Sequence, residues 1–279
     1  MIPAIQSELR KFLSTKMWWV LAIVTVGYVG LSALSTAWAL GWLLTDGMAS
    51  AGAGSEDVGM ITAAMGDYHG MVYGMAASLG YFIAAMMGAL AVTAEYRHNT
   101  IAVTFLAEPR RWIVVLAKVV AALPMGLILA VVAVVSALGL GALGFVVAGD
   151  ATHLGDSSTW RLAGLQLVTL MLWTAIGTGL GLLVRSQVGV IIGVLVFTLL
   201  LEPILRMIFM IFESTRSISR FLPSAASEAA AGGESAYSLV SDTGTVDLLS
   251  VPQGILVLLA YGVVFGVAGY FLRVRRDVA

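Results

Sequence analysis

Six apolar runs, each long enough to cross a lipid bilayer as a helix, constrain what this sequence can fold into. A spanning helix needs about 20 consecutive apolar residues, because backbone polar groups inside the bilayer must be hydrogen-bonded within the segment. Charged residues make up only 11% of the chain, against about 25% in a typical soluble domain. The sequence therefore predicts an all-α integral membrane protein with a single transmembrane domain over residues 1–279 and spans at about 17–44, 71–94, 113–148, 160–184, 188–212 and 252–272.

Basic residues are divided unequally between the two sides of these predicted spans. Because Lys and Arg are retained on the cytoplasmic side, the larger group predicts that both termini are cytoplasmic. The abundance of Ala, Gly and Val is typical of a high-GC bacterium, so we expect a multi-pass protein of the bacterial plasma membrane. The predicted inner group is Arg10, Lys11, Lys16, Arg97, Arg110, Arg111, Lys118, Arg185, Arg273, Arg275 and Arg276, and the outer group is Arg161, Arg206, Arg216 and Arg220.

The segments between the spans also carry patterns. Residues 1–16 place apolar side chains at helical spacing among basic ones, which predicts an amphipathic helix on the membrane surface. Residues 213–251 are expected to form an external segment with short helices that dip into the outer interface. The third run is longer than the bilayer is thick, so we expect it to tilt, to kink at Pro124, or to protrude with Lys118 snorkelling toward water.

The loop at 95–112, between the second and third spans, is short and basic. Asn99 or Thr100 can cap a short helix whose apolar residues Ile101, Phe105 and Leu106 share one face. Pro109 is expected to end this helix, because a proline pushes the preceding residue out of the α region. A short amphipathic helix held by a span at each end is suited to docking in a groove on a soluble partner.

The same loop reads Glu-Tyr-Arg-His-Asn-Thr-Ile, then Thr-Phe-Leu and Pro-Arg-Arg, and in this it resembles the ABC type-2 permeases, the membrane subunits of ATP-driven exporters. The resemblance implies a coupling helix that receives the motion of a separate ATPase chain. It also implies a homodimer with two ATPase subunits, which bind the ATP and Mg. The residues to which it assigns coupling are Glu95, Arg97, Asn99, Thr100, Ile101, Thr104, Phe105, Leu106, Arg110 and Arg111. The alternative for Arg110 and Arg111 is a role in topology and in contact with lipid headgroups, and the alternative for Glu95 and Arg97 is ordinary interfacial anchoring.

Sequence motifs for catalysis are missing from the chain. It contains no phosphate-binding GxxxxGK[ST] loop, HExxH or GxSxG, and no cysteine. The predicted cytoplasmic segments are too short to form a nucleotide-binding domain, so we expect no enzyme activity, no cofactor and no metal in this chain, and no nucleic-acid partner. His69 and His153 are expected to be solvated loop residues. Glycine pairs at 139–144, 177–181, 189–193 and 262–266 are interpreted as sites of close helix packing.

The fifth span carries two charges at membrane depth. Glu202 and Arg206 are four residues apart, so one helix face presents both, and Pro203 between them weakens the backbone hydrogen bonding. Such groups are costly in a membrane and usually face a cavity or a partner. They are interpreted either as part of a translocation path or outer gate, or as a self-neutralising pair that fixes the helix.

Three functional classes follow from these observations. The first is the permease subunit of an ABC exporter for an amphipathic or hydrophobic substrate such as a drug, natural product, peptide or lipid. The second is an ion-coupled secondary transporter, a class that usually shows acids deep in several spans. The third is a non-transporting membrane scaffold or an intramembrane enzyme. The basic amphipathic loop favours the first class, with membrane lipids and a second copy of the chain as further partners.

Overall fold

The computed structural model of the chain describes residues 2–274 except 51, 53, 99, 109, 185, 212 and 233–248. Every regular element in this described part is a helix. Six helical stretches are long and apolar enough to cross a membrane, which confirms the six predicted spans. Their bounds are Met17–Gly47, Tyr68–Arg97, Arg111–Val147, Ser157–Leu183, Gln187–Phe209 and Val251–Leu272.

The elements up to α9 build an N-terminal helix and the first three spans. They are α1 (Ile2–Ser14), α2 (Met17–Thr25), π-helical η1 (Val26–Gly30), α3 (Leu31–Trp42), η2 (Leu43–Gly47), α4 (Met48–Ser50), α5 (Ser55–Met65), α6 (Tyr68–Tyr73), α7 (Met75–Arg97), α8 (Ile101–Ala107) and α9 (Arg111–Val147). The second half adds α10 (Ser157–Leu183), α11 (Gln187–Val196), η3 (Phe197–Leu201), α12 (Glu202–Ile211), α13 (Glu213–Ser219), α14 (Pro223–Ala231), α15 (Val251–Gly269) and η4 (Tyr270–Val274).

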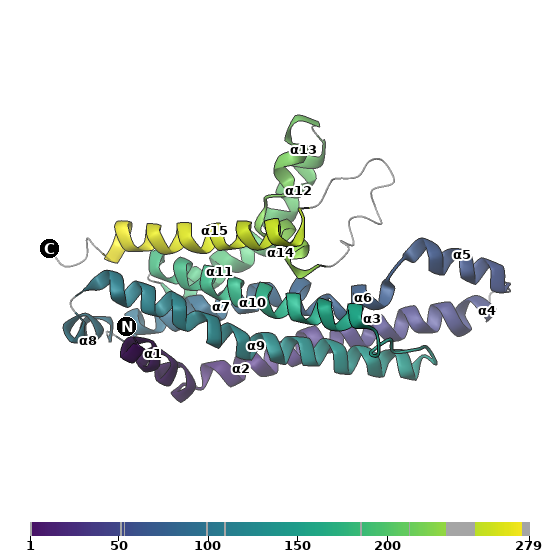
Figure 1. Cartoon of the computed structure of the whole chain (residues 1–279), viewed down its shortest axis with the longest axis horizontal. Coiled ribbons are helices and arrows are strands. Elements are labelled where there is room, and N and C mark those ends of the chain that lie inside the picture. The colour runs from purple at the N-terminus through teal and green to yellow at the C-terminus, as the bar shows by residue number, and fades with distance from the viewer. Residues whose placement is uncertain are drawn as a thin grey trace.

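The spans form an elongated bundle with two distinct ends (Figure 1). At one end lie α1, α8 and the end of α15, and we call this the α8 end. At the other lie α4, α5 and the connection between α9 and α10, and we call this the α5 end. The helix α9 contains 37 residues, or about 55 Å, so it exceeds the hydrocarbon layer and extends beyond it.

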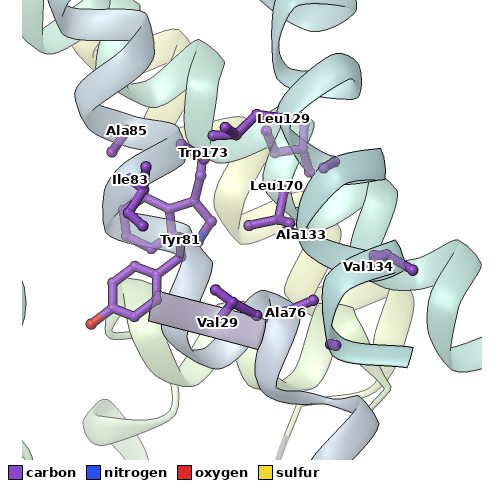
Figure 2. Close-up of a cluster of buried hydrophobic side chains, with 14 of the residues drawn as sticks. Val29, Ala76, Tyr81, Ile83, Ala85, Leu129, Ala133, Val134, Leu170 and Trp173 are labelled. Atoms are coloured by element: carbon purple, nitrogen blue, oxygen red, sulfur yellow. The ribbon is translucent and has the colours of Figure 1, made fainter. Parts of the chain in front are cut away.

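The core of the bundle lies between α7, α9 and α10, which pack against one another. Figure 2 shows apolar side chains of these helices and of η1 meeting there, with the rings of Tyr81 and Trp173 4.8 Å apart between centroids. Small residues bring α10 against α7: a Cβ atom at Gly177 would lie 1.8 Å from the carbonyl oxygen of Ala85. The close packing predicted for the 177–181 pair is therefore confirmed.

Two other glycine pairs do not pack closely, contrary to the prediction. A Cβ atom at Gly193 would meet nothing within 4 Å, and one at Gly262 or Gly266 would make only ordinary contacts at 3.8 Å. The spacing of small residues is a property of the local sequence, whereas close packing of two helices also requires the second helix to lie opposite those residues. These glycines leave open volume.

We expect Gly177→Ala to destabilise the protein by about 2 kcal/mol, the usual cost of overpacking a tight contact, because the added methyl group meets the α7 backbone. Gly193→Ala is the matched control, since it adds the same methyl group to a spanning helix in open space. The measurement is the unfolding temperature of each variant in detergent. Equal unfolding temperatures for the two variants would refute the close α7–α10 contact.

The fifth span is bent, which the sequence did not predict. Its first part, α11, runs along the bundle, whereas α12 and α13 turn away from it (Figure 1). The π-helical turn η3 lies between them and ends at Leu201, two residues before Pro203. A proline removes a backbone donor and clashes with the preceding turn, which accounts for a widened turn at this place.

Candidate functional site

Four charged side chains from three helices meet near the α8 end, and we call them the four-charge cluster: Glu8, Lys11, Glu95 and Lys118. The Nζ atom of Lys118 lies 2.8 Å from Glu8 and 2.7 Å from Glu95. The Nζ atom of Lys11 lies 2.7 Å from Glu8 and 3.0 Å from Glu95. The cluster therefore connects α1 to α7 and α9, and its two positive charges balance its two negative charges.

The cluster corrects the expectation that Lys118 snorkels toward water. Its side chain is only 2% exposed, because carboxylates from α1 and α7 neutralise it inside the protein. Glu8 is buried as well, although the sequence places it on the polar side of an amphipathic helix. A buried charge retained in this way must be paired, since desolvation is otherwise costly. The apolar residue Phe12 is also buried, so α1 packs its inner face against α9.

Glu8 and Lys11, the members of the cluster that lie outside the spans, both have pKa values displaced away from neutral pH. Burial alone would raise the pKa of Glu8, but the charges and hydrogen bonds of Lys118 and Lys11 outweigh it and hold the pKa below 4.5. Burial would lower the pKa of Lys11, but Glu8 and Glu95 raise it above 10.5. The contribution of Glu8 is therefore lost only in acid below pH 4.5, and that of Lys11 only in base above pH 10.5.

The helix α8 lies beside the cluster. Lys11 donates a hydrogen bond to the hydroxyl of Thr104 at 3.4 Å. Phe105 packs against a small buried cluster of Val92, Val115 and Leu182, which come from α7, α9 and α10; Tyr96 and Tyr270 pack against the same cluster. Arg111 adds a cation–π contact, with its Cζ atom 5.8 Å from the centroid of the Phe105 ring. One side of α8 is therefore fixed to the bundle.

The other side of α8 is open. Leu106 is 83% exposed and Val103 is 65% exposed, and these two residues lie three positions apart on the same helix. The predicted common face of Phe105 and Leu106 is therefore wrong: Phe105 points into the bundle and Leu106 away from it. Adjacent positions on a helix do not face the same way, and the buried cluster that contains Val115 receives Phe105.

Other residues assigned to coupling lie at the start of α8, at the end of α7 and just before α9. Thr100 occupies the N-cap position of α8 without a side-chain cap, and its hydroxyl donates to the Glu95 carbonyl oxygen at 3.5 Å, so the predicted cap at Thr100 is not formed. Ile101 is half-buried and Arg110 is exposed. Arg97 donates to the side chain of Gln187 at 3.0 Å, which joins α7 to the start of α11. Asn99 and Pro109 lie outside the described residues.

Sequence reasoning missed the contribution of Glu8, Lys11 and Lys118 to this site. A signal existed for one of them, because Lys118 is a lone charge in a long apolar run and such residues usually have a partner. No local sequence pattern identifies that partner, because one such partner is Glu8, 110 positions away along the chain.

A second polar site joins α12 to α14. Glu202 is fully buried, and its carboxylate accepts a hydrogen bond from the backbone N–H of Ser224. Arg206, on the same face one turn later, forms a salt bridge with Glu228 at 3.0 Å. We call these two interactions the α12–α14 contact. Pro203 follows Glu202 and lies directly after the bend at η3. Both charges of the fifth span therefore reach α14, the second helix after α12.

The helix α14 is itself built into the bundle. It packs against α15 and α10, and the indole N–H of Trp173 on α10 donates to the hydroxyl of Ser227 at 2.9 Å. Pro223 starts the helix and Gly232 ends it with a φ of +70°, a conformation that favours glycine. The predicted short helices of the external segment are thus present at α13 and α14, whereas residues 233–248 lie outside the described part.

An apolar cavity of about 420 Å³ lies next to the α12–α14 contact. Helices α7, α10, α11, α12 and α15 line it, and Leu222 and Pro223 close one end. Its lining extends along the fifth span from Gly189 to Leu205, about 24 Å of helix. The polar groups of two lining residues are used internally: the hydroxyl of Tyr261 donates to the Phe221 carbonyl and that of Thr198 to the Val194 carbonyl. The cavity suits an apolar molecule.

Of the two histidines at the α5 end, His69 is not the solvated loop residue that was predicted. His69 is buried in α6, where it lies 3.0 Å from the Ala151 carbonyl oxygen and 3.3 Å from Asp150. Its ring lies against the rings of Phe145 and of the more exposed His153 in tilted arrangements. The prediction for His69 is wrong because α6 extends the second span beyond its apolar run. Among the described residues, no group of three or more histidines and carboxylates could hold a metal ion.

Comparison with known proteins agrees with this arrangement. The model of the ABC-2 family transporter proteins matches residues 3–278, which is nearly the whole chain. A search of curated proteins found no match. With six candidate spanning helices and a match of this extent, the chain belongs to the ABC-2 transporter family. Members of this family are multi-pass membrane subunits without an ATPase domain of their own, and they work with an ABC ATPase.

Proposed function

We propose that this ABC-2 transporter family member is the permease subunit of an exporter that moves an amphipathic or hydrophobic substrate out of a bacterial cell. A separate ATPase, present in two copies with bound ATP and Mg, drives the movement, and two copies of the chain form the permease. The α8 end faces the cytoplasm, in keeping with the excess of basic residues on that side.

The observation that carries this proposal is the two-sided character of α8. Its inner side is held by Phe105 and by the hydrogen bond from Lys11 to Thr104. Its outer side presents Leu106 and Val103, large apolar side chains that no part of the described chain covers. An exposed apolar pair on a firmly attached helix is suited to a groove on a soluble partner.

The attachments of α8 also provide a route for motion. Force applied to α8 passes through Phe105 to α9 and η4, and through Lys11 and Glu95 to α7. Because α7, α9 and α10 form the core of the bundle, a shift of α8 moves the spans that carry it. Glu95 and Arg97 act here as the junction between the second span and the coupling helix.

The proposed substrate class rests on the cavity. Its lining is almost entirely apolar, and its outer end is closed by Leu222 and Pro223, next to the α12–α14 contact. In this proposal the contact through Glu202, Pro203 and Arg206 is the outer gate. The exposed apolar residues of α11 and α12, which include Ile192, Met207 and Ile211, support a second copy of the chain as the neighbour on that side.

The experiment that tests the function is purification of the chain from its native membrane, followed by reconstitution in vesicles. We expect an ABC ATPase to co-purify in equal amount and substrate movement to require hydrolysable ATP. A chain that purifies alone and transports on an ion gradient without ATP is a secondary transporter, with Glu202 as its prime candidate for ion coupling.

We expect Glu228→Gln to loosen α14 and to open the cavity more often. Loss of a partly buried, charged hydrogen bond costs about 1.5 kcal/mol, which corresponds to roughly a tenfold larger open population. The chain has no cysteine, so Ser227→Cys provides a single thiol that is buried in the closed state. Its labelling by a membrane-impermeant reagent should become about tenfold faster in the Glu228→Gln background.

Glu108→Gln is the matched control for this experiment, since it removes an exposed carboxylate at the other end of the bundle. An unchanged labelling rate in Glu228→Gln would show that the Arg206 salt bridge does not hold α14 closed.

A further inference from the structure

A second apolar groove, of about 320 Å³, lies on the outside of the bundle between α9 and α15. Both helices also pack against α10. Val115 and Val119 line the α9 side, and Gly262 and Gly266 line the α15 side. The groove has almost no polar surface, so whatever occupies it is apolar there.

The two glycines are what make this groove. A Cβ atom at Gly266 would lie 3.8 Å from Val119, and one at Gly262 would lie 3.8 Å from Ile176 on α10. Larger residues would therefore fit at both places, in contrast to Gly179, where a Cβ atom would come within 2.9 Å of the α15 backbone. Helix packing thus requires the glycine at 179, which lies against the backbone of Gly266, but it does not require glycine at 262 or 266. Their effect is an open channel along α15.

The groove follows the direction of the two spanning helices that line it. Trp112 and Tyr270 line its mouth at the α8 end, and aromatic residues of these types favour the level of the lipid headgroups. Gly262 lies eight positions before Tyr270 on the same helix, about 12 Å deeper in the bilayer. A narrow apolar channel that starts at headgroup level has the direction of a lipid acyl chain.

Positive charge surrounds the mouth. Arg111 lies over the ring of Phe105, and Phe105 packs with Val115 and Tyr270, which line the groove. Arg110 precedes it at the N-terminus of α9 and is exposed. The nearest acid in sequence, Glu108, accepts a hydrogen bond from the backbone N–H of Arg110.

We propose that this groove binds one acyl chain of an anionic phospholipid from the leaflet at the α8 end, with its phosphate held by Arg110 and Arg111. Apolar volume below and cationic groups above match the two parts of such a lipid. The bound chain lies against Val115 and Tyr270, which also pack with Phe105 of α8, so the lipid braces this helix. Binding itself does not rest on the proposed function.

The test is photocross-linking in nanodiscs with a phosphatidylglycerol that carries a photoreactive acyl chain, compared with the same probe built on phosphatidylcholine. We expect labelled peptides to map to residues 112–119 and 262–270, with phosphatidylglycerol labelling about tenfold more than phosphatidylcholine. Filling the groove by Gly266→Leu, or from the opposite wall by Val119→Phe, should reduce this labelling about tenfold, since contact with several methylene groups is lost. Arg110→Gln combined with Arg111→Gln should remove the preference for phosphatidylglycerol.

Two controls keep the result specific. Gly139→Leu adds the same side chain to an exposed position of α9 with nothing within 4 Å, and Arg161→Gln removes an exposed cation from the start of α10 at the α5 end. Neither should change the labelling. Equal labelling by the two lipids, or labelling that persists in both groove-filling variants with unchanged unfolding temperatures, would show ordinary contact with bulk lipid and overturn the proposal.

Discussion

Replacing Leu106 with Asp is expected to reduce ATP-driven transport about a hundredfold, because roughly 2.7 kcal/mol of docking energy is lost when a central apolar anchor becomes charged. Leu106 is 83% exposed and belongs to neither hydrophobic cluster of the bundle. The substitution therefore removes little packing from the folded chain, and the unfolding temperature should stay unchanged. Val103→Asp, one turn earlier on the same open side, should act in the same direction.

The matched control is Met60→Asp, which places the same charge on an exposed apolar residue of α5 at the opposite end of the bundle. Transport and ATP hydrolysis are measured with reconstituted complexes of each variant. Normal transport by Leu106→Asp would place the ATPase contact elsewhere. A lowered unfolding temperature would instead give Leu106 a structural role.

Replacing Lys118 with Met is expected to destabilise the chain by about 3 kcal/mol or more, the usual cost of removing one partner from a buried ion pair. Lys118 is 2% exposed and contacts both Glu8 and Glu95. Without it, two buried carboxylates share Lys11, whose side chain is partly exposed. The expected results are a lower unfolding temperature and release of α1 from the bundle, measured as faster backbone hydrogen exchange in residues 2–14.

Restoring the charge balance should reverse this effect. In the double variant Glu95→Gln with Lys118→Met, the remaining pair of Glu8 and Lys11 is neutral, and we expect most of the lost stability to return. Lys16→Met is the control, because Lys16 is exposed and takes no part in the ion pairs of the cluster. If Lys118→Met and Lys16→Met cost the same stability, the four-charge cluster does not fasten α1.

The spans could be predicted because the bilayer imposes a requirement that each segment satisfies by its own composition. The short helix at 101–107 could also be predicted, since its position between a basic turn and Pro109 is a local pattern. Its orientation could not. Whether Phe105 or Leu106 faces the bundle depends on Val115 and Tyr270, which the chain brings to this place from elsewhere.

The charged sites show the same division. The i,i+4 spacing of Glu202 and Arg206 correctly places them on one face, but nothing near them in sequence indicates that Ser224 and Glu228 receive that face. Lys118 stands out as a charge in an apolar run, but its two carboxylate partners come from α1 and α7. Long-range pairs become visible only when the helices are packed.

The central claim is that α8 docks on the ATPase, and site-specific photocross-linking in native membranes tests it most directly. A photoreactive residue replaces Leu106 in one sample and Met60 of α5 in the other. The account predicts a cross-linked product between position 106 and an ATP-binding chain, and none from position 60. A product from position 60, or none from position 106 in membranes that transport with ATP, would contradict it.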